Sequence, residues 1–403
     1  MGHQPAIPFS RWLIILLLML GGVLMAACTQ GAASMDLLQP QVENTPSGNA
    51  TPTAPYVEPT VTPSVTATTT PTITPTSTPT VTPTSIAPPP FEYEALNDGV
   101  ESVNYLADHC SYLEARWNPA NAAPGTVVVP VMFHGISAAG PRGKDNITIS
   151  TNYFLSSMER ARKLGFETIS MQELVDFLQR NTYIPPRSLL LVIDDRRLGT
   201  VREHFMPVLK KYDWTLTMAY ITGVINEQEW DQVRDVLDRG YTELQAHGYL
   251  HNGQTYITEW TTAEVIREEL FAPIQSFEEH LGYRPIAFIW PGGNFNQTSV
   301  TLAREAEYQV AFTAFARGPL MFNWVPQGEP ERELGDPLMT LPRYWSTTLY
   351  RNLDYALEMG SAAAAQAESQ RIDEINWYQS NCSAFPPLSI PYQNESNEVP
   401  DRW

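Results

Sequence analysis

Two adjacent aspartates, Asp194 and Asp195, follow the continuous apolar run Ser188–Ile193 (SLLLVI). Two carboxylates side by side at the end of a buried strand are unfavourable unless a positive charge compensates them. A bound cation is the simplest compensation. The alternative is a pair of solvated turn residues that cap the following helix, and the pair taken alone favours that alternative.

Two histidines, His247 and His251, are spaced by four residues and lie just past the predicted strand 241–246. On a helical turn this spacing places both rings on one face, where they could supply two nitrogen ligands to one metal ion. A surface pair in a loop is the alternative. The chain contains only 7 histidines, and these two follow a predicted strand just as the aspartates do. The combination therefore favours a metal site.

From residue 126 onward, short apolar runs alternate with helical patterns. This alternation predicts parallel βαβ units, and the number of units favours a distorted (β/α)7–8 barrel over an open sheet. Catalytic groups of such barrels lie at the carboxyl ends of the strands, and the candidate residues all follow predicted strands. The predicted strands are 126–133, 188–193, 215–221, 241–246, 285–289, 309–312 and 340–344. The predicted helices are 152–164, 170–178, 201–212, 228–239 and a long one that begins at Thr261-x-x-Glu264 and stops at Gly282.

Five segments, in this order, resemble motifs of the polysaccharide deacetylase domain, also called the NodB homology or carbohydrate esterase family 4 domain. The order is similar to the permuted, poly-N-acetylglucosamine deacetylase type. The resemblance covers about residues 126–358, and several motifs in order are more specific than any single one. The segments are Pro130–His134 (PVMFH), Ile184–Asp195 (IPPRSLLLVIDD), Ala246–His251 (AHGYLH), Phe288–Gly293 (FIWPGG) and Leu341–Tyr344 (LPRY).

The resemblance implies a role for each site residue. Asp195, His247 and His251 would hold Zn²⁺ or a similar divalent ion, and Asp194 would be the general base. His134 would be the general acid that protonates the leaving amine, with a buried structural histidine as the alternative.

The third motif, Trp290-Pro291-Gly292-Gly293, would border the substrate, and a backbone N–H near Gly292 would stabilise the oxyanion. Aromatic side chains in or near these segments could stack on sugar rings, or they could pack within the barrel. They are Trp290, Phe295, Tyr249 and Trp345.

The sequence departs from the family pattern at two positions. Arg196 stands where a glycine usually follows the aspartates, and a positive φ there would cost on the order of 1 kcal/mol. Ile289 stands where many relatives have an arginine that orients the base. Arg343 could approach Asp194 from the last strand and take over that role. These departures keep open a catalytically impaired protein that serves as a glycan-binding surface lipoprotein.

The first 90 residues differ from the rest. Residues 1–27 have the pattern of a lipoprotein signal peptide, with a basic residue, a short apolar run and small residues before Cys28. Cys28 would then carry lipid, and the alternative is an uncleaved membrane anchor. Residues 28–90 contain a Thr/Pro-rich tract that predicts a disordered, extended linker.

Two flanks border the deacetylase-like region, an N-terminal flank at 91–125 and a C-terminal extension at 359–403. Each contains one cysteine, Cys110 and Cys382. In an oxidising exterior the two could form a disulfide, and two free thiols are the alternative.

The formal net charge of −19 excludes nucleic acid as a partner, because its binding depends on phosphate neutralisation. We therefore expect a hydrolase that is lipid-anchored to the outer face of a bacterial cell membrane. It would remove N-acetyl groups from peptidoglycan or a poly-N-acetylglucosamine-like glycan. An esterase or amidase of the same fold, acting on O-acetyl or other N-acyl groups, is an alternative because it needs the same catalytic parts.

Overall fold

The computed structural model describes residues 87–141, 147–251 and 256–388. The predicted signal peptide, Cys28 and residues 28–86 of the predicted linker lie outside the described residues. Among the helices that are described, none has the length and apolar character needed to cross a membrane.

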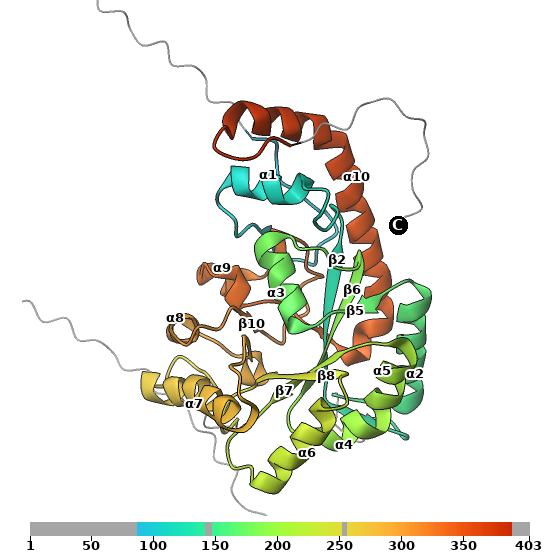
Figure 1. Ribbon diagram of the computed structural model, residues 1–403, viewed down its shortest axis with the longest axis vertical. Coiled ribbons are helices and arrows are strands. Elements are labelled where there is room, and N and C mark those ends of the chain that lie inside the picture. Colours follow the sequence, from blue (N-terminus) through green and yellow to red (C-terminus); the bar gives the residue numbers. More distant parts are fainter. Residues whose placement is uncertain (1–86, 142–146, 252–255, 389–403) are drawn as a thin grey trace, which may run out of the picture. The chain divides into compact units, whose positions relative to one another are not determined.

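A curled sheet of parallel strands forms the centre of the fold (Figure 1). All seven residues of its strand β2 are buried, which explains the continuous apolar run in the sequence. In spatial order the strands are β10 (Val310–Phe312), β9 (Ala287–Ile289), β8 (Thr242–Ala246), β7 (Leu216–Tyr220), β6 (Arg187–Asp194), β2 (Val127–Phe133) and β12 (Tyr344–Trp345), and β5 (Glu167–Thr168) also pairs with β6.

One short segment connects the two ends of this sheet. Leu341 forms a parallel bridge with Phe312 of β10, and β12 pairs in parallel with Val131–Met132 of β2. The predicted barrel is thereby confirmed, although the predicted strand 340–344 is not continuous. Pro342 stands between the two pairings, and it has no N–H to donate to a strand ladder.

Helices follow most of the strands and cover the sheet (Figure 1). The helix predicted over 170–178 is α3, and it begins with a capping box in which Ser170 and Glu173 are bonded to each other's backbone N–H. The helices are α1 (His109–Trp117), α2 (Thr151–Lys163), α3 (Met171–Arg180), α4 (Leu198–Thr200), α5 (Met206–Tyr212), α6 (Glu227–Leu237), α7 (Ala263–Leu281), α8 (Gln297–Glu305), α9 (Glu329–Glu333) and α10 (Leu349–Asn381).

Two predicted helices differ from the structure in detail. Residues 201–212 are helical as predicted, but Val201–Phe205 form a π-helical turn that continues directly into α5. Pro207, which has no N–H to donate, lies just after this turn. Helix α7 begins after Thr262. The hydroxyl of Thr261 instead accepts a hydrogen bond from the Thr258 N–H.

The two flanks pack together at the amino end of β2. Helix α1 lies against α10, which runs alongside β2 and α2 (Figure 1). Cys110 and Cys382 form a disulfide between these two helical segments. Strand β1 (Glu101–Val103) pairs with β11 (Val325–Gln327), and β3 (Gly135–Ser137) pairs with β4 (Thr148–Ser150).

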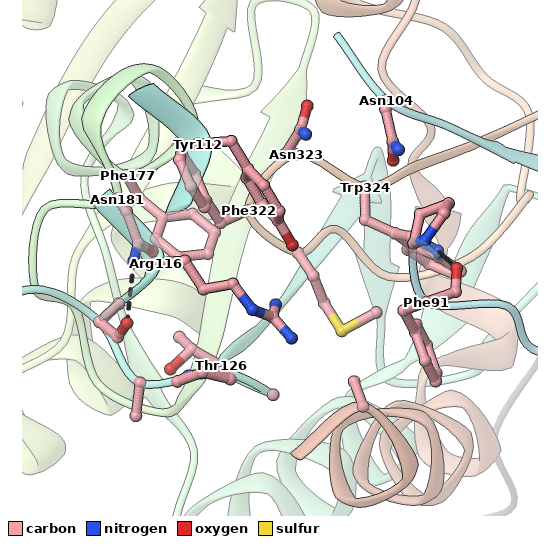
Figure 2. A pocket seen from close by; sticks show the side chains of 17 residues that line it. Phe91, Asn104, Tyr112, Arg116, Thr126, Phe177, Asn181, Phe322, Asn323 and Trp324 are labelled. Atoms are coloured by element: carbon pink, nitrogen blue, oxygen red, sulfur yellow. Dashed lines mark hydrogen bonds between the residues drawn. The ribbon is translucent and has the colours of Figure 1, made fainter. Parts of the chain in front are cut away.

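A pocket lies at this amino end, between the flanks and the start of β2. Aromatic side chains of Phe91, Tyr112, Phe322 and Trp324 line it. Figure 2 shows the guanidinium group of Arg116 extending into the middle of the pocket. The Nε of Arg116 donates to Glu374 of α10 over 2.9 Å.

Candidate active site

The carboxyl ends of the strands bring the predicted catalytic residues together. Asp194 is the last residue of β6 and His134 directly follows β2, whose register pairs Phe133 with Ile193. His247 directly follows β8, and Arg343 directly precedes β12. The strand-end rule therefore places His134, Asp194 and His247 at one edge of the sheet, and Arg343 reaches the same edge from the start of its strand.

Asp194 is buried, not a solvated turn residue, and it is held from one side. Nη1 of Arg343 donates to its Oδ1 over 2.6 Å, and Nε of Arg343 donates to the Thr313 carbonyl over 2.9 Å. Oδ2 of Asp194 lies 3.8 Å from Nε2 of His134 and 4.0 Å from Nε2 of His247. Burial by itself raises the pKa of Asp194, but the charges of Arg343 and the two histidines outweigh it and lower the pKa to about 2. Asp194 is therefore ionised at neutral pH.

Asp195, His247 and His251 form a group that could hold a metal ion. One ligand atom from each lies within 4.8 Å of the others. Nδ1 of His247 is hydrogen-bonded to the Ile289 carbonyl over 2.8 Å, which leaves its Nε2 for a ligand. Burial lowers the pKa of His247 to about 4, so its imidazole is neutral at pH 7. Two imidazoles and one carboxylate, with one ring fixed by a carbonyl, fit a divalent transition metal.

The two histidines do not lie on a helical turn, so that prediction is wrong. They lie in an irregular loop after β8, where Gly248 has a φ of +81° and His251 a φ of +45°. These left-handed residues turn the chain back, and the two ring centroids are 4.4 Å apart. The two rings therefore lie close together because of the loop conformation, and not because of a helical repeat.

Sequence reasoning missed Glu269, which binds this loop. Glu269 belongs to α7 and is 2% exposed. Its carboxylate accepts hydrogen bonds from the backbone N–H groups of Tyr249, Leu250 and His251. The available signal was its position between Ile266 and Leu270, on the buried face of an amphipathic helix, where an acid is rare.

The turn after Asp194 corrects another prediction. The residue with positive φ is Asp195, at 68°, and not Arg196. Arg196 therefore carries no strain of the kind expected for a replaced glycine. Arg197 donates to Oδ2 of Asp195 over 2.9 Å, while Oδ1 lies 3.9 Å from Nε2 of His247. One oxygen of Asp195 thus faces the histidines.

The polysaccharide deacetylase family model matches residues 183–311. This range includes the two aspartates, the two histidines and Glu269. Residues 183–311 form a polysaccharide deacetylase domain. The predicted family and the hydrolase class are thereby confirmed. His134 lies before the matched range of the deacetylase domain and Arg343 lies after it.

Several solved structures are similar to the chain. A Streptococcus pyogenes deacetylase, PplD, in complex with acetate has 19% identity, covers 57% of this chain and 98% of its own, and has a TM-score of 0.47. IcaB from Ammonifex degensii has 20% identity, with 58% and 97% covered and a TM-score of 0.45. A de-N-acetylase from Aggregatibacter actinomycetemcomitans has 17% identity, with 57% and 99% covered and a TM-score of 0.46. No curated protein sequence matches the chain.

The third motif of the deacetylase domain is only partly accessible. Trp290 is fully buried, and its Nε1 donates to the Met339 carbonyl over 2.9 Å. The prediction that Trp290 could contact a sugar is therefore wrong, because the ring packs in the core. Pro291 and Gly293 are also buried, and Gly293 packs so closely on Ala314 that a side chain has no room.

Gly292 is the exposed residue of this motif, and the Tyr256 ring lies beside it. Tyr256, another residue that sequence reasoning missed, also contacts the ring of His251 edge-on, with centroids 5.4 Å apart. The predicted oxyanion donor and a candidate metal ligand thus share one aromatic neighbour.

The other predicted aromatic residues lie in different environments. Trp345 stacks on His134, with centroids 6.2 Å apart and planes at 15°. Phe295 packs edge-on against Phe315, and Tyr249 is half-buried in the histidine loop. Trp345 is therefore the predicted aromatic residue that contacts a catalytic candidate.

Proposed function

We propose that this protein is a metal-dependent hydrolase that removes N-acetyl groups from an extracellular polymer of amino sugars. Peptidoglycan or a poly-N-acetylglucosamine-like glycan would be the substrate. One observation carries the proposal. A buried, ionised Asp194 has one oxygen held by Arg343 and the other directed to His134 and His247, next to three side chains that could bind a metal.

Each residue has a task in this proposal. Asp195, His247 and His251 would hold the divalent ion, with Zn²⁺ as our choice because imidazole and carboxylate ligands suit it. When bound, the ion would supply Lewis-acid activation of the acetamide carbonyl and of a water molecule.

Asp194 would take the proton of the attacking water through Oδ2, because Oδ1 is occupied by Arg343. Arg343 would keep Asp194 ionised and fix its orientation, in place of the arginine that Ile289 replaces. His134 would donate a proton to the leaving amine from the edge of the site, where Trp345 supports its ring. The N–H of Gly292 would stabilise the oxyanion.

The two departures from the family pattern do not support the impaired-enzyme alternative. The positive φ falls on Asp195, so Arg196 costs nothing there. Arg343 occupies the position beside Asp194 that an orienting arginine requires. We also propose an exported, lipid-anchored location, which the signal-like segment 1–27 with Cys28 and the Thr/Pro-rich tract support.

An acetate-release screen tests the proposal. Wild-type protein is incubated with N-acetylated chitin oligomers, poly-N-acetylglucosamine, peptidoglycan and O-acetylated xylan, and chelator-stripped protein is the control. We expect acetate from at least one N-acetylated glycan, loss of activity after stripping, and recovery with Zn²⁺. Release from the O-acetylated polymer alone would replace the amidase assignment with an esterase. No release from any polymer, with metal bound, would favour a glycan-binding protein.

A further inference from the structure

Glu269 is a buried acid that the proposed mechanism does not use. It lies on α7, outside every motif that carries the family resemblance, and its surroundings on that helix face are apolar. A carboxylate in such a position is costly unless its oxygens are fully hydrogen-bonded. Its three partners are all amides of the loop that carries His251.

We propose that Glu269 is a positioning residue for the metal ligand His251 and acts through the backbone of residues 249–251. The proposal rests on the metal site of the proposed function. Its consequence is that the affinity for the metal depends on a residue that contributes no ligand atom.

The hydrogen bonds define the geometry of this contact. Oε2 of Glu269 accepts from Tyr249 N over 2.9 Å and from His251 N over 3.3 Å. Oε1 accepts from Leu250 N over 2.9 Å. Successive N–H groups that converge in this way form an anion-binding concavity. Here a side chain from a helix 18 residues further along the chain fills it.

Gly248 is required for this approach. A Cβ atom at Gly248 would lie 2.5 Å from Oε2 of Glu269, and the φ of +81° is itself unfavourable for other residues. Gly248 therefore both turns the chain and leaves room for the carboxylate of Glu269. Without the carboxylate, three N–H groups would lose their acceptor, which is unfavourable for N–H groups shielded from water.

The two histidines are held by different devices. The ring of His247 is fixed directly by the Ile289 carbonyl. His251 is fixed through its own backbone N–H, while its ring contacts His247 and Tyr256. Loss of Glu269 should therefore displace His251 and leave His247 in place.

A double-mutant cycle tests this assignment. Zn²⁺ affinity is measured by chelator competition for wild type, Glu269→Gln, His251→Ala and the double variant. We expect Glu269→Gln to weaken Zn²⁺ binding by about 10- to 100-fold. In the His251→Ala background it should change the affinity by no more than about 2-fold, because its effect passes through His251. The d–d spectrum of the Co²⁺-loaded protein should change in Glu269→Gln as the ligand geometry changes.

Glu243→Gln is the matched control. Glu243 is a half-buried acid on β8 that accepts a hydrogen bond from the Met171 N–H over 2.6 Å. We expect this variant to bind Zn²⁺ as wild type does. Melting curves in chelator report folding separately, and Glu269→Asp, which keeps the charge, should lose less affinity than Glu269→Gln.

The outcomes separate this proposal from the proposed function. Equal Zn²⁺ affinity in wild type and Glu269→Gln, or equal losses in both backgrounds, would overturn the positioning role. Wild-type protein that binds Zn²⁺ but releases no acetate would overturn the proposed function and leave the positioning role intact. Wild-type protein that binds no Zn²⁺ would overturn both.

Discussion

The two ends of the barrel each contain a buried arginine–carboxylate pair. At the carboxyl end, Arg343 and Asp194 are 2.6 Å apart, with side chains 1% and 4% exposed. At the amino end, Arg116 and Glu374 are 2.9 Å apart, with side chains 13% and 5% exposed. The chemical pair is the same, so any difference in role must come from what surrounds it.

The two carboxylates differ in the side chains that surround them. Arg343 occupies Oδ1 of Asp194, and Oδ2 faces two histidines at 3.8 and 4.0 Å. At the amino end, Oε2 of Glu374 accepts from Arg116 and also from Nε1 of Trp117 over 2.6 Å. Asp194 therefore presents its second oxygen to two histidines, which can bind metals or protons. Glu374 instead connects α10 to α1 beside the disulfide.

Asp194→Asn should have the largest effect on turnover. The amide cannot accept the proton of the attacking water, so we expect kcat to fall by about 10²- to 10⁴-fold. Because the three proposed ligands remain, Zn²⁺ content should stay near wild type. Acetate release and metal analysis on the same sample check both statements. Full loss of the metal would mean that Asp194 is itself a ligand.

Arg343→Ala should have the next largest effect. Without the guanidinium, burial remains and raises the pKa of Asp194, so the acidic limb of the pH–rate profile should move to higher pH. We expect kcat at neutral pH to fall on the order of 10²-fold, because Asp194 also loses its orientation. A profile of kcat against pH measures both effects.

Arg343→Lys is the control for this variant, because it keeps the charge but not the forked geometry. It should keep the acidic limb closer to wild type while losing part of the turnover.

The lowered pKa of Asp194 in wild type stabilises the fold above a pH of about 4, the ordinary carboxyl range. That contribution disappears as the pH falls toward about 2, and Arg343→Ala should lack it. If Arg343→Ala had the wild-type rate and pH profile, the pair of Arg343 and Asp194 would have no role in turnover.

The carboxyl end was predictable from the sequence because residue type and strand position suffice there. Apolar runs located the strands, and the residues just after them had to meet at one edge of the sheet. Arg343 lies inside the predicted strand 340–344 and not after it, so its approach to Asp194 rested on the missing arginine at Ile289 and not on this rule. The amino end was less predictable: the pairing of Cys110 with Cys382 stayed open because the partners are 272 residues apart.

The local conformations were not predictable. The spacing of His247 and His251 is the same on a helix and in this loop, and the choice depends on Glu269, a contact from a different element. The glycine usually found at position 196 raises the question of a positive φ at Arg196, but the turn places the positive φ on Asp195. Trp290 follows a strand like the candidate catalytic residues, but its ring is directed into the core. In each case tertiary packing decides.

Glu374→Gln should have the smallest effect on turnover and a clear effect on stability. The substitution leaves Arg116 largely buried without its counter-charge, and breaking such a pair costs about 3–5 kcal/mol. We expect a lower melting temperature, with kcat and Zn²⁺ affinity unchanged. The matched control is Glu305→Gln, which breaks the exposed pair with Arg267, where both side chains are 51% exposed. That change should cost less than about 1 kcal/mol.

The comparison between the two ends depends on this last result. If Glu374→Gln lowered turnover without lowering stability, the amino end would influence the reaction at the opposite end of β2. The pocket that contains Arg116 would then be a functional site. If it lowers stability alone, the same ion pair serves two purposes in one fold. The difference in role would then come from the neighbours of each pair. Two histidines lie beside Asp194, whereas Glu374 accepts a hydrogen bond from the indole N–H of Trp117.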